Sequence, residues 1–117
     1  MPVRCLIVDD NDAFLHSATR LLEAQGLRVV GVASSGEEAA RLVRELSPDV
    51  ALVDMELDGE TGTEVAKLLA SAQPQLAVIL ISAYPEEELV DLVTAGPAAG
   101  FIPKSRLSAD AIDQLLD

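Results

Sequence analysis

Five polar residues have the types and spacing that phosphoryl transfer requires, and each follows a short apolar run: Asp9, Asp10, Asp54, Ser82 and Lys104. Carboxylates gathered in one place repel one another unless they share a proton or a cation. A hard divalent cation such as Mg²⁺ takes oxygen ligands and needs only one or two carboxylates besides waters and a phosphate. One aspartate is then left to attack a phosphoryl group, while a lysine and a hydroxyl neutralise the phosphoryl oxygens.

These residues must be positioned by the elements that precede them. Runs rich in β-branched residues alternate with helical patterns, which is typical of βα units around a parallel sheet. Strands are predicted at residues 3–8, 28–33, 50–54, 77–82 and 100–102. The pattern predicts an α/β fold, a doubly wound, flavodoxin-like five-stranded parallel sheet in the order 2-1-3-4-5 with five helices. Because such sheets bind ligands at the carboxyl ends of their strands, the five polar residues are expected to meet at one edge.

Amphipathic helices are predicted between the strands. A capping box of Ser35 and Glu38 begins the second helix, Pro85 begins the fourth, and Ile112 lies on the apolar face of the fifth. The apolar faces of the first and third helices are Phe14, Leu15, Ala18, Leu21 and Leu22, and Val65, Leu68, Leu69 and Ala72.

Composition limits the class of protein. A chain of 117 residues is expected to form one domain over 1–117, large enough to bury a core without disulfides. A net charge of −12 argues against binding nucleic acid or an anionic membrane surface. Cys5 is the only cysteine, the sequence begins without a signal peptide, and the longest apolar run is too short to span a bilayer. We therefore expect a cytoplasmic protein without membrane association.

Simpler interpretations of the polar residues exist. Asp9, Asp10 and Asn11 could cap the first helix, and Asp54 could be a loop residue before the Asp58-Gly59 turn.

Two other functional classes, an enzyme and an electron carrier, also share this fold. An Asp-nucleophile phosphatase would use Glu56, two residues after Asp54, as a general acid, but the sequence has no capping insertion. A flavin carrier is nearly excluded, because the acidic loop after the first strand would repel phosphate.

The sequence resembles the receiver domain of two-component response regulators, a CheY-like family, over essentially its whole length. The matching segments are 6–11, 52–62, 81–83 and 100–104. The resemblance implies that Asp54 is the phosphoacceptor and that Mg²⁺, with Mn²⁺ as an alternative, is held by Asp9, Asp10, Asp54 and the backbone carbonyl of Glu56. It further implies three roles: Ser82 as the switch hydroxyl, Lys104 as the phosphate-pairing lysine, and Phe101 as the aromatic that changes rotamer.

The sequence departs from the family pattern at several positions. Asp58 stands where proline is frequent, and Phe101 replaces the tyrosine of many members. Ser105 follows Lys104 in place of proline, so we expect a trans peptide bond there. The residues that flank the line of attack of water on the phosphoryl group are Glu56 and Tyr84. We hypothesise that Tyr84 shields this group and Glu56 repels the attacking water, giving slow self-hydrolysis; the alternative is that both are solvated loop residues.

The function implied by the resemblance is bacterial phosphorelay signalling. Asp54 would accept a phosphoryl group from a sensor histidine kinase or a histidine phosphotransfer protein, and the domain would promote its own Mg²⁺-dependent phosphorylation and dephosphorylation without being a conventional enzyme. The output surface in this family corresponds to residues 85–95, 100–102 and 108–117, which also offers a homodimer interface. The alternatives are the phosphatase above and a pseudo-receiver that binds partners without phosphorylation.

Overall fold

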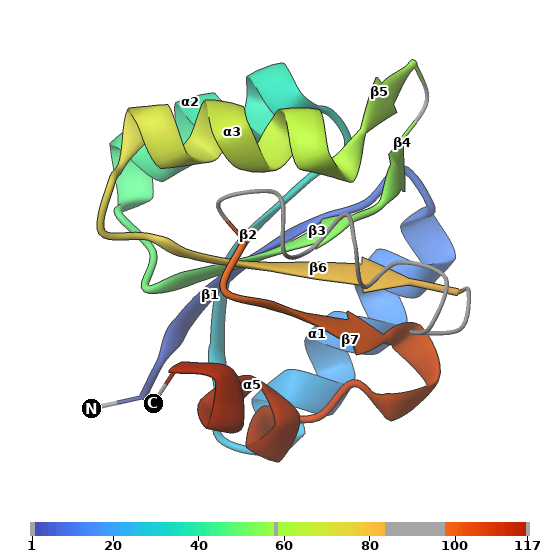
Figure 1. Ribbon diagram of the computed structural model, residues 1–117. Coiled ribbons are helices and arrows are strands. Elements are labelled where there is room, and N and C mark those ends of the chain that lie inside the picture. Colours follow the sequence, from blue (N-terminus) through green and yellow to red (C-terminus); the bar gives the residue numbers. More distant parts are fainter. Residues whose placement is uncertain (1, 58, 84–97, 117) are drawn as a thin grey trace.

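The computed structural model of the protein describes residues 2–57, 59–83 and 98–116. Figure 1 shows the elements in their chain order. The strands are β1 (Arg4–Val8), β2 (Arg28–Ala33), β3 (Val50–Asp54), β4 (Glu56–Leu57), β5 (Glu60–Thr61), β6 (Ala77–Ser82) and β7 (Gly100–Pro103). The helices are α1 (Asp12–Ala24), α2 (Gly36–Leu46), α3 (Gly62–Ala72), the 3-10 helix η2 (Lys104–Arg106) and α5 (Ala109–Leu116).

The main sheet has five parallel strands in the order β2-β1-β3-β6-β7. Counted within this sheet, the order is the predicted 2-1-3-4-5, so the predicted fold class is confirmed. The central strand β3 is buried along its whole length, and β1 and β6 are buried except at their first residues. Their continuous apolar sequences therefore reflect strands that are covered on both faces.

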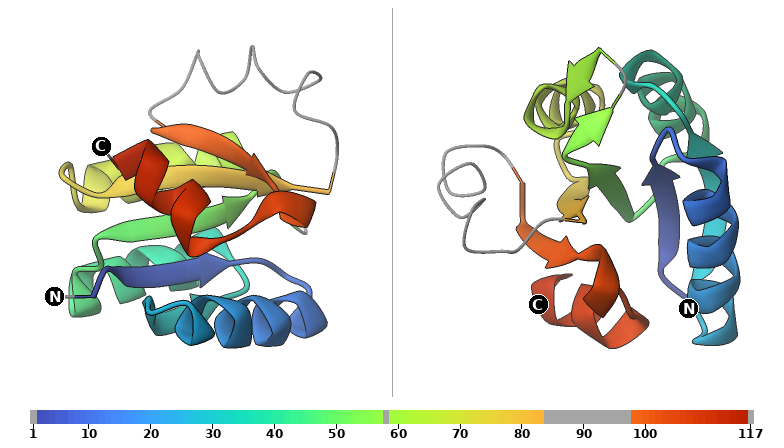
Figure 2. Two further views of the ribbon diagram at one scale, coloured as in Figure 1. Left: turned by 90° about the horizontal axis from the view of Figure 1, so that it is seen from below. Right: turned by 90° about the vertical axis from the view of Figure 1, so that its right-hand side faces the viewer.

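Helices cover both faces of this sheet. Figures 1 and 2 show α2 and α3 on one side, and α1 and α5 on the other. Alternating residues of each strand enter different apolar clusters: Leu6 and Val8 pack on the α2–α3 side, and Cys5 and Ile7 pack on the α1–α5 side. The result is a three-layer arrangement in which a rigid sheet fixes where each strand ends.

The helix starts follow ordinary capping chemistry. Asn11, Ser35 and Thr61 each accept a hydrogen bond from the backbone N–H three residues later, at the starts of α1, α2 and α3. The predicted capping box at Ser35 forms in part: Ser35 caps the helix, but Glu38 accepts its hydrogen bond from the N–H of Ser34, one residue before the cap, rather than from that of Ser35. Among the described residues, no helix has the length and hydropathy needed to span a membrane.

Some local predictions differ from the structure. Leu21 and Leu68 are 40% and 39% exposed, so the prediction that both belong to buried helix faces is wrong. Each lies at the margin of the apolar face of its helix, and this face is wider than the part of the helix that contacts the sheet. The short antiparallel hairpin of β4 and β5 and the 3-10 helix η2 were not predicted. The predicted fourth helix, residues 85–95, lies outside the described residues.

Candidate functional site

Three carboxylates converge at the carboxyl ends of two neighbouring strands. Asp9 directly follows β1, and Asp54 is the last residue of β3, which pairs with β1. One carboxylate oxygen from each of Asp9, Asp10 and Asp54 lies within 4.8 Å of the others. Asp9 is fully buried and Asp54 is 8% exposed, whereas Asp10 is exposed to solvent. The sheet topology thus brings together residues that are far apart in the sequence.

Asp9 is held by its own backbone and by the start of α1. Its N–H donates to the carbonyl of Ala33 at 2.9 Å, and its Oδ1 accepts a hydrogen bond of 2.9 Å from the N–H of Asn11. Asn11 in turn accepts from the N–H of Phe14 at 3.0 Å and caps α1. The capping interpretation therefore applies to Asn11, and the side chains of Asp9 and Asp10 are directed to the acidic cluster.

Lys104 brings the one described ammonium group at this edge. It begins η2 directly after β7, and its Nζ lies 2.7 Å from Asp9 Oδ2 and 3.4 Å from Asp54 Oδ2. The described residues contain no cis peptide bond, so the expected trans bond between Lys104 and Ser105 is confirmed. Lys104 therefore neutralises part of the charge of two of the three carboxylates.

The pKa values show that this neutralisation is incomplete. Burial, followed by the negative charge of Asp9, raises the pKa of Asp54 above its usual value, although the N–H of Glu56 and the Lys104 ammonium act in the opposite direction. Burial disfavours the charged form of Lys104, but its contacts with Asp9 and Asp54 outweigh burial and raise its pKa. The lysine is therefore protonated, while Asp54 carries a charge that the fold does not fully stabilise.

The site suits a divalent cation. Asp9 Oδ2 is buried and is paired with the Lys104 ammonium at 2.7 Å. Three carboxylates facing one ammonium leave an excess of negative charge. Oxygen ligands of this kind match the preference of Mg²⁺ and related hard cations. The acidic cluster of Asp9, Asp10 and Asp54 is thus able to hold a metal ion.

Ser82 lies on β6, the strand next to Asp54, and Phe101 lies one strand further, on β7. Ser82 ends β6, one residue beyond Ile81, which is the register partner of Asp54, and it is only 2% exposed. Ser82 is also the register partner of Pro103, the residue before Lys104. Phe101 lies on β7, is half-buried, and packs against the apolar cluster on the α2–α3 side. Tyr84 lies outside the described residues.

The hairpin of β4 and β5 shapes the loop after Asp54. The N–H of Glu56 donates to Asp54 Oδ1 at 3.3 Å, and the Glu56 side chain is exposed. The hairpin closes where the N–H of Gly62 donates to the carbonyl of Met55 at 2.7 Å. A Cβ at Gly62 would lie 2.6 Å from the Asp54 carbonyl oxygen, so only glycine allows α3 to start this close to the phosphoacceptor candidate.

Sequence reasoning missed two contacts at the site. Phe14, assigned to the apolar face of the first helix, places its ring centroid 4.3 Å from Lys104 Nζ. Glu60 accepts a hydrogen bond of 2.9 Å from the N–H of Gly36 and so links the hairpin to the start of α2. Neither contact has a local signal, because each joins segments that only the fold brings together.

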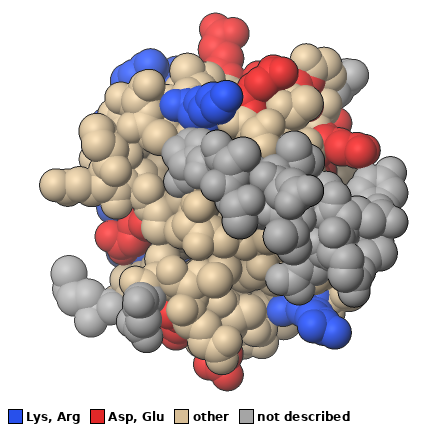
Figure 3. Space-filling model, in the orientation of Figure 1, with Lys and Arg blue, Asp and Glu red and all other residues tan. Residues whose placement is uncertain are grey.

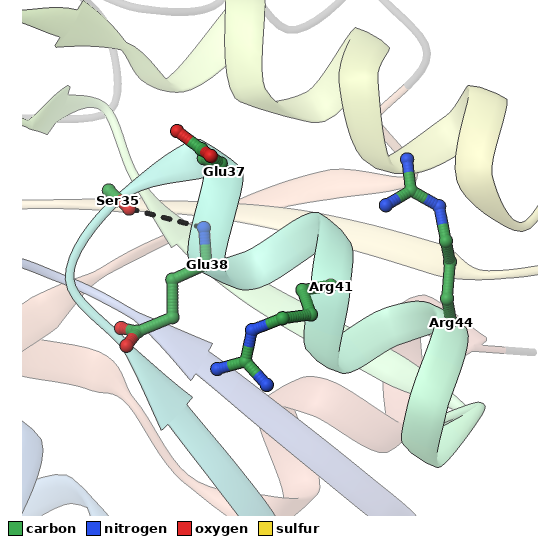
Figure 4. A pocket seen from close by; sticks show the side chains of 5 residues that line it. All are labelled: Ser35, Glu37, Glu38, Arg41 and Arg44. Carbon is green, nitrogen blue, oxygen red and sulfur yellow. Dashed lines mark hydrogen bonds between the residues drawn. The ribbon is translucent and has the colours of Figure 1, made fainter.

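Other charged features of the surface do not form a comparable site. A hollow beside α2 is lined by Ser35, Glu37, Glu38, Arg41 and Arg44. Figure 4 shows that Arg41 and Arg44 leave the helix in different directions, and Arg41 pairs with Glu45 at 3.2 Å. On the face shown in Figure 3, acidic side chains lie at separate places around the outline. The acidic cluster of Asp9, Asp10 and Asp54 is therefore distinct from this dispersed surface charge.

Comparisons with known proteins agree with this geometry. Residues 5–116 match the response regulator receiver domain family. The response regulator GacA of Pseudomonas aeruginosa is 36% identical over 103 residues, which cover 87% of this chain and 48% of GacA. The receiver domain of the putative response regulator NarL from Mycobacterium tuberculosis has a TM-score of 0.84 at 32% identity, covering 97% of this chain and 96% of that domain.

A third comparison involves a complex with ligands. The crystal structure of the CheX–CheY–BeF3–Mg²⁺ complex from Borrelia burgdorferi has a TM-score of 0.83 at 25% identity, covering 99% of this chain and 87% of that one. The chain spans about half the length of GacA and of the full-length NarL regulator that it matches. Since the family match covers nearly all of its residues, the chain belongs to the receiver domain family of two-component response regulators.

Proposed function

We propose that residues 1–117 form one receiver domain in which Asp54 accepts a phosphoryl group and thereby switches the conformation of the domain. The observation that carries this proposal is the convergence of Asp9, Asp10 and Asp54 within 4.8 Å, with Lys104 Nζ 3.4 Å from Asp54 Oδ2. Family membership supports a phosphoacceptor acting in signalling rather than a conventional enzyme.

In the proposed step, an Asp54 carboxylate oxygen attacks the phosphorus of the donor. A phosphorus–oxygen bond forms and the phosphorus–nitrogen bond of a phosphohistidine donor breaks; the released nitrogen keeps the electron pair, and the imidazole leaves neutral with a ring proton that it takes from solvent. The N–H of Glu56 holds Oδ1 of the attacking carboxylate, and Lys104 neutralises charge on the phosphoryl oxygens. Ser82 donates a hydrogen bond to another of these oxygens and reports the new charge.

The metal ligands would be Asp9, Asp10, Asp54 and the backbone carbonyl of Glu56, and Mn²⁺ would be able to replace Mg²⁺. A bound divalent cation would supply charge neutralisation for the carboxylates and the transferred group. The convergence of carboxylate oxygens from Asp9, Asp10 and Asp54 within 4.8 Å of one another, opposite one ammonium, supports their assignment as ligands. The Mg²⁺ named with the Borrelia CheX–CheY complex is consistent with this choice of ion.

The proposed phosphoryl donor is a sensor histidine kinase or a histidine phosphotransfer protein, acting in the cytoplasm. The proposed output is a surface that includes Phe101 on β7 and the exposed side of α5, where a hollow is lined by Phe101, Pro103, Arg106 and Leu115, among others. Rotamer change at Phe101 would alter this surface and promote homodimerisation. A net charge of −12 argues that this domain does not itself bind nucleic acid.

Lifetime of the phosphorylated state is proposed to depend on Glu56 and Tyr84. The exposed Glu56 side chain lies two residues after Asp54 and would repel the negative charge that develops on the attacking water. Replacement of Tyr84 by Ala is expected to accelerate loss of the phosphoryl group, and an unchanged decay rate would remove the shielding role of Tyr84.

The decisive test is incubation with acetyl phosphate with and without Mg²⁺, followed by intact-mass measurement. We expect one phosphoryl group per chain, only when Mg²⁺ is present, and none in Asp54→Asn. Asp113→Asn, which changes an exposed aspartate of α5, is the matched control and should be phosphorylated like the wild type. A folded wild-type protein that gains no phosphoryl group would contradict the proposal and favour a pseudo-receiver.

A further inference from the structure

We propose that Phe14 is a positioning residue that holds the Lys104 ammonium group ready for the transferred phosphoryl group. This proposal rests on the proposed function, because it concerns how Lys104 meets the phosphoryl oxygens at Asp54. The Phe14 ring centroid lies 4.3 Å from Lys104 Nζ, within the range of a cation–π interaction.

Phe14 belongs to a closed cycle of contacts around the site. Asp9 Oδ1 accepts from the N–H of Asn11, and Asn11 Oδ1 accepts from the N–H of Phe14. The Phe14 ring faces Lys104 Nζ, which lies 2.7 Å from Asp9 Oδ2. The cycle therefore begins and ends on the carboxylate of Asp9. Because Asn11 caps α1 and is bonded to this carboxylate, the Phe14 ring is held at a defined position relative to the Asp9–Lys104 pair.

The surroundings of Lys104 explain why an aromatic ring suits this position. The lysine side chain is 20% exposed, and its ammonium contacts the carboxylates of Asp9 and Asp54. A ring face attracts the positive charge through its quadrupole but accepts no strong hydrogen bond. Phe14 thus restrains the ammonium without occupying one of its N–H donors, as a third carboxylate would. A phosphoryl oxygen can later replace Asp9 or Asp54 as a hydrogen-bond partner of Lys104.

Restraint of Lys104 has a direct benefit for phosphoryl transfer. A free lysine side chain samples many rotamers, and part of this rotamer entropy must be lost when its ammonium is fixed at a reacting group. Because the Phe14 ring already limits the rotamers of Lys104 before the reaction, less side-chain entropy is lost during phosphoryl transfer. Phe14 is only half-buried, so its ring serves both the apolar cluster on the α1–α5 side and the ammonium.

The first test is spectroscopic and needs no phosphorylation. The sequence contains two lysines, Lys67 and Lys104, so selective lysine labelling gives two sets of NMR signals. The εCH₂ protons of Lys104 should be shifted upfield by the ring current of Phe14, with the exposed Lys67 on α3 as the internal reference. Phe14→Leu should move the Lys104 signals to the position of Lys67, whereas Phe14→Tyr should retain the shift.

The second test measures the rate of phosphorylation by acetyl phosphate at saturating Mg²⁺. Phe14→Leu should lower the maximal rate constant by about fivefold, as expected for a partly buried cation–π contact, and leave the half-saturating donor concentration nearly unchanged. Phe14→Tyr should restore most of the rate. Both variants should unfold near the wild-type temperature, because Phe14 is only half-buried.

Three results would overturn the proposal. One is a Lys104 signal without an upfield shift in the wild type, and another is a phosphorylated wild type with an equal rate in Phe14→Leu. The third is a Phe14→Tyr variant as slow as Phe14→Leu despite native stability. None of these three results touches the proposed function, which fails only if a folded wild type takes up no phosphoryl group; the two failures are therefore distinguishable.

Discussion

The interior of the main sheet and its carboxyl-terminal edge are built from the same strands. They differ in their side chains: those of the interior are apolar and fully packed, whereas those of the edge carry charges that the fold only partly neutralises. Along β1, Cys5, Leu6, Ile7 and Val8 are fully buried in apolar clusters on both faces. The next residue, Asp9, is equally buried but carries a carboxylate that shares this edge with those of Asp10 and Asp54 and faces the Lys104 ammonium at 2.7 Å. The interior thus provides stability, and the edge retains charge that a ligand can use.

The largest predicted effect tests the interior. Leu52 on β3 is fully buried between Ile7 and Ile79, its register partners on β1 and β6. Leu52→Ala should lower the free energy of unfolding by about 2–5 kcal/mol, measured by urea denaturation. Leu21→Ala, at a leucine that is 40% exposed, is the matched control and should change it by less than about 0.5 kcal/mol. Equal losses would contradict the structure, in which Leu52 is fully buried and Leu21 is exposed.

A smaller effect is expected where the two regions meet. A Cβ at Gly62 would contact the Asp54 carbonyl oxygen at 2.6 Å and Met55 Cα at 2.7 Å, both backbone atoms. Gly62→Ala should therefore cost about 1–3 kcal/mol of stability and reduce phosphorylation of Asp54. At Gly31 a Cβ would meet only leucine side-chain atoms, the nearest at 3.3 Å, so Gly31→Ala should retain phosphorylation. Normal phosphorylation of Gly62→Ala would contradict the proposed role of this close approach.

A change of the opposite sign is expected at the edge itself. Burial and the charge of Asp9 raise the pKa of Asp54, so removal of its charge should relieve repulsion. Asp54→Asn, without added metal, should stabilise the protein by about 0.5–2 kcal/mol, as often occurs when a strained functional residue is replaced. Asp113→Asn should leave the melting temperature nearly unchanged. A destabilised Asp54→Asn would show that its contacts with Lys104 and Glu56 outweigh the repulsion.

The smallest effect concerns a titratable group of the interior. Burial raises the pKa of the Cys5 thiol from 9.0 to about 12. The unfolded thiol ionises at lower pH than the native thiol, so stability from this group is complete below pH 9 and decreases between pH 9 and about 12. At pH 10 the wild type should have lost about 1 kcal/mol more than Cys5→Ala, relative to pH 8. Identical pH dependence of the two proteins would contradict this.

The sequence predicted the strands well because burial on both faces leaves a continuous apolar run. It also predicted which polar residues end those strands, and parallel pairing of β1 with β3 then brings Asp9, Asp10 and Asp54 together. The positions of the strands and of the polar residues that end them follow from the apolar periodicity and from the alternation of strands and helices, which the local sequence shows. The predicted roles of Ser82, Phe101, Glu56 and Tyr84 remain predictions.

Contacts between distant segments could not be predicted in the same way. The Phe14 ring meets Lys104 only because η2 returns the chain to the start of α1. The hydrogen bond from Gly36 to Glu60 depends on a hairpin of two two-residue strands, too short to give a periodic signal. Leu21 and Leu68 show a further limit, because an apolar stripe does not reveal how much of its width the sheet covers.

The central claim is that the fold leaves the carboxylates at this edge in need of a cation, and the most direct measurement is the free energy of unfolding with and without Mg²⁺. For the wild type we predict an increase of about 1.4 kcal/mol when Mg²⁺ is present at ten times its dissociation constant. The increase should be largely lost in Asp10→Asn and retained in Asp113→Asn. A wild-type stability that does not change at millimolar Mg²⁺, or that rises equally in all three proteins, would contradict the claim.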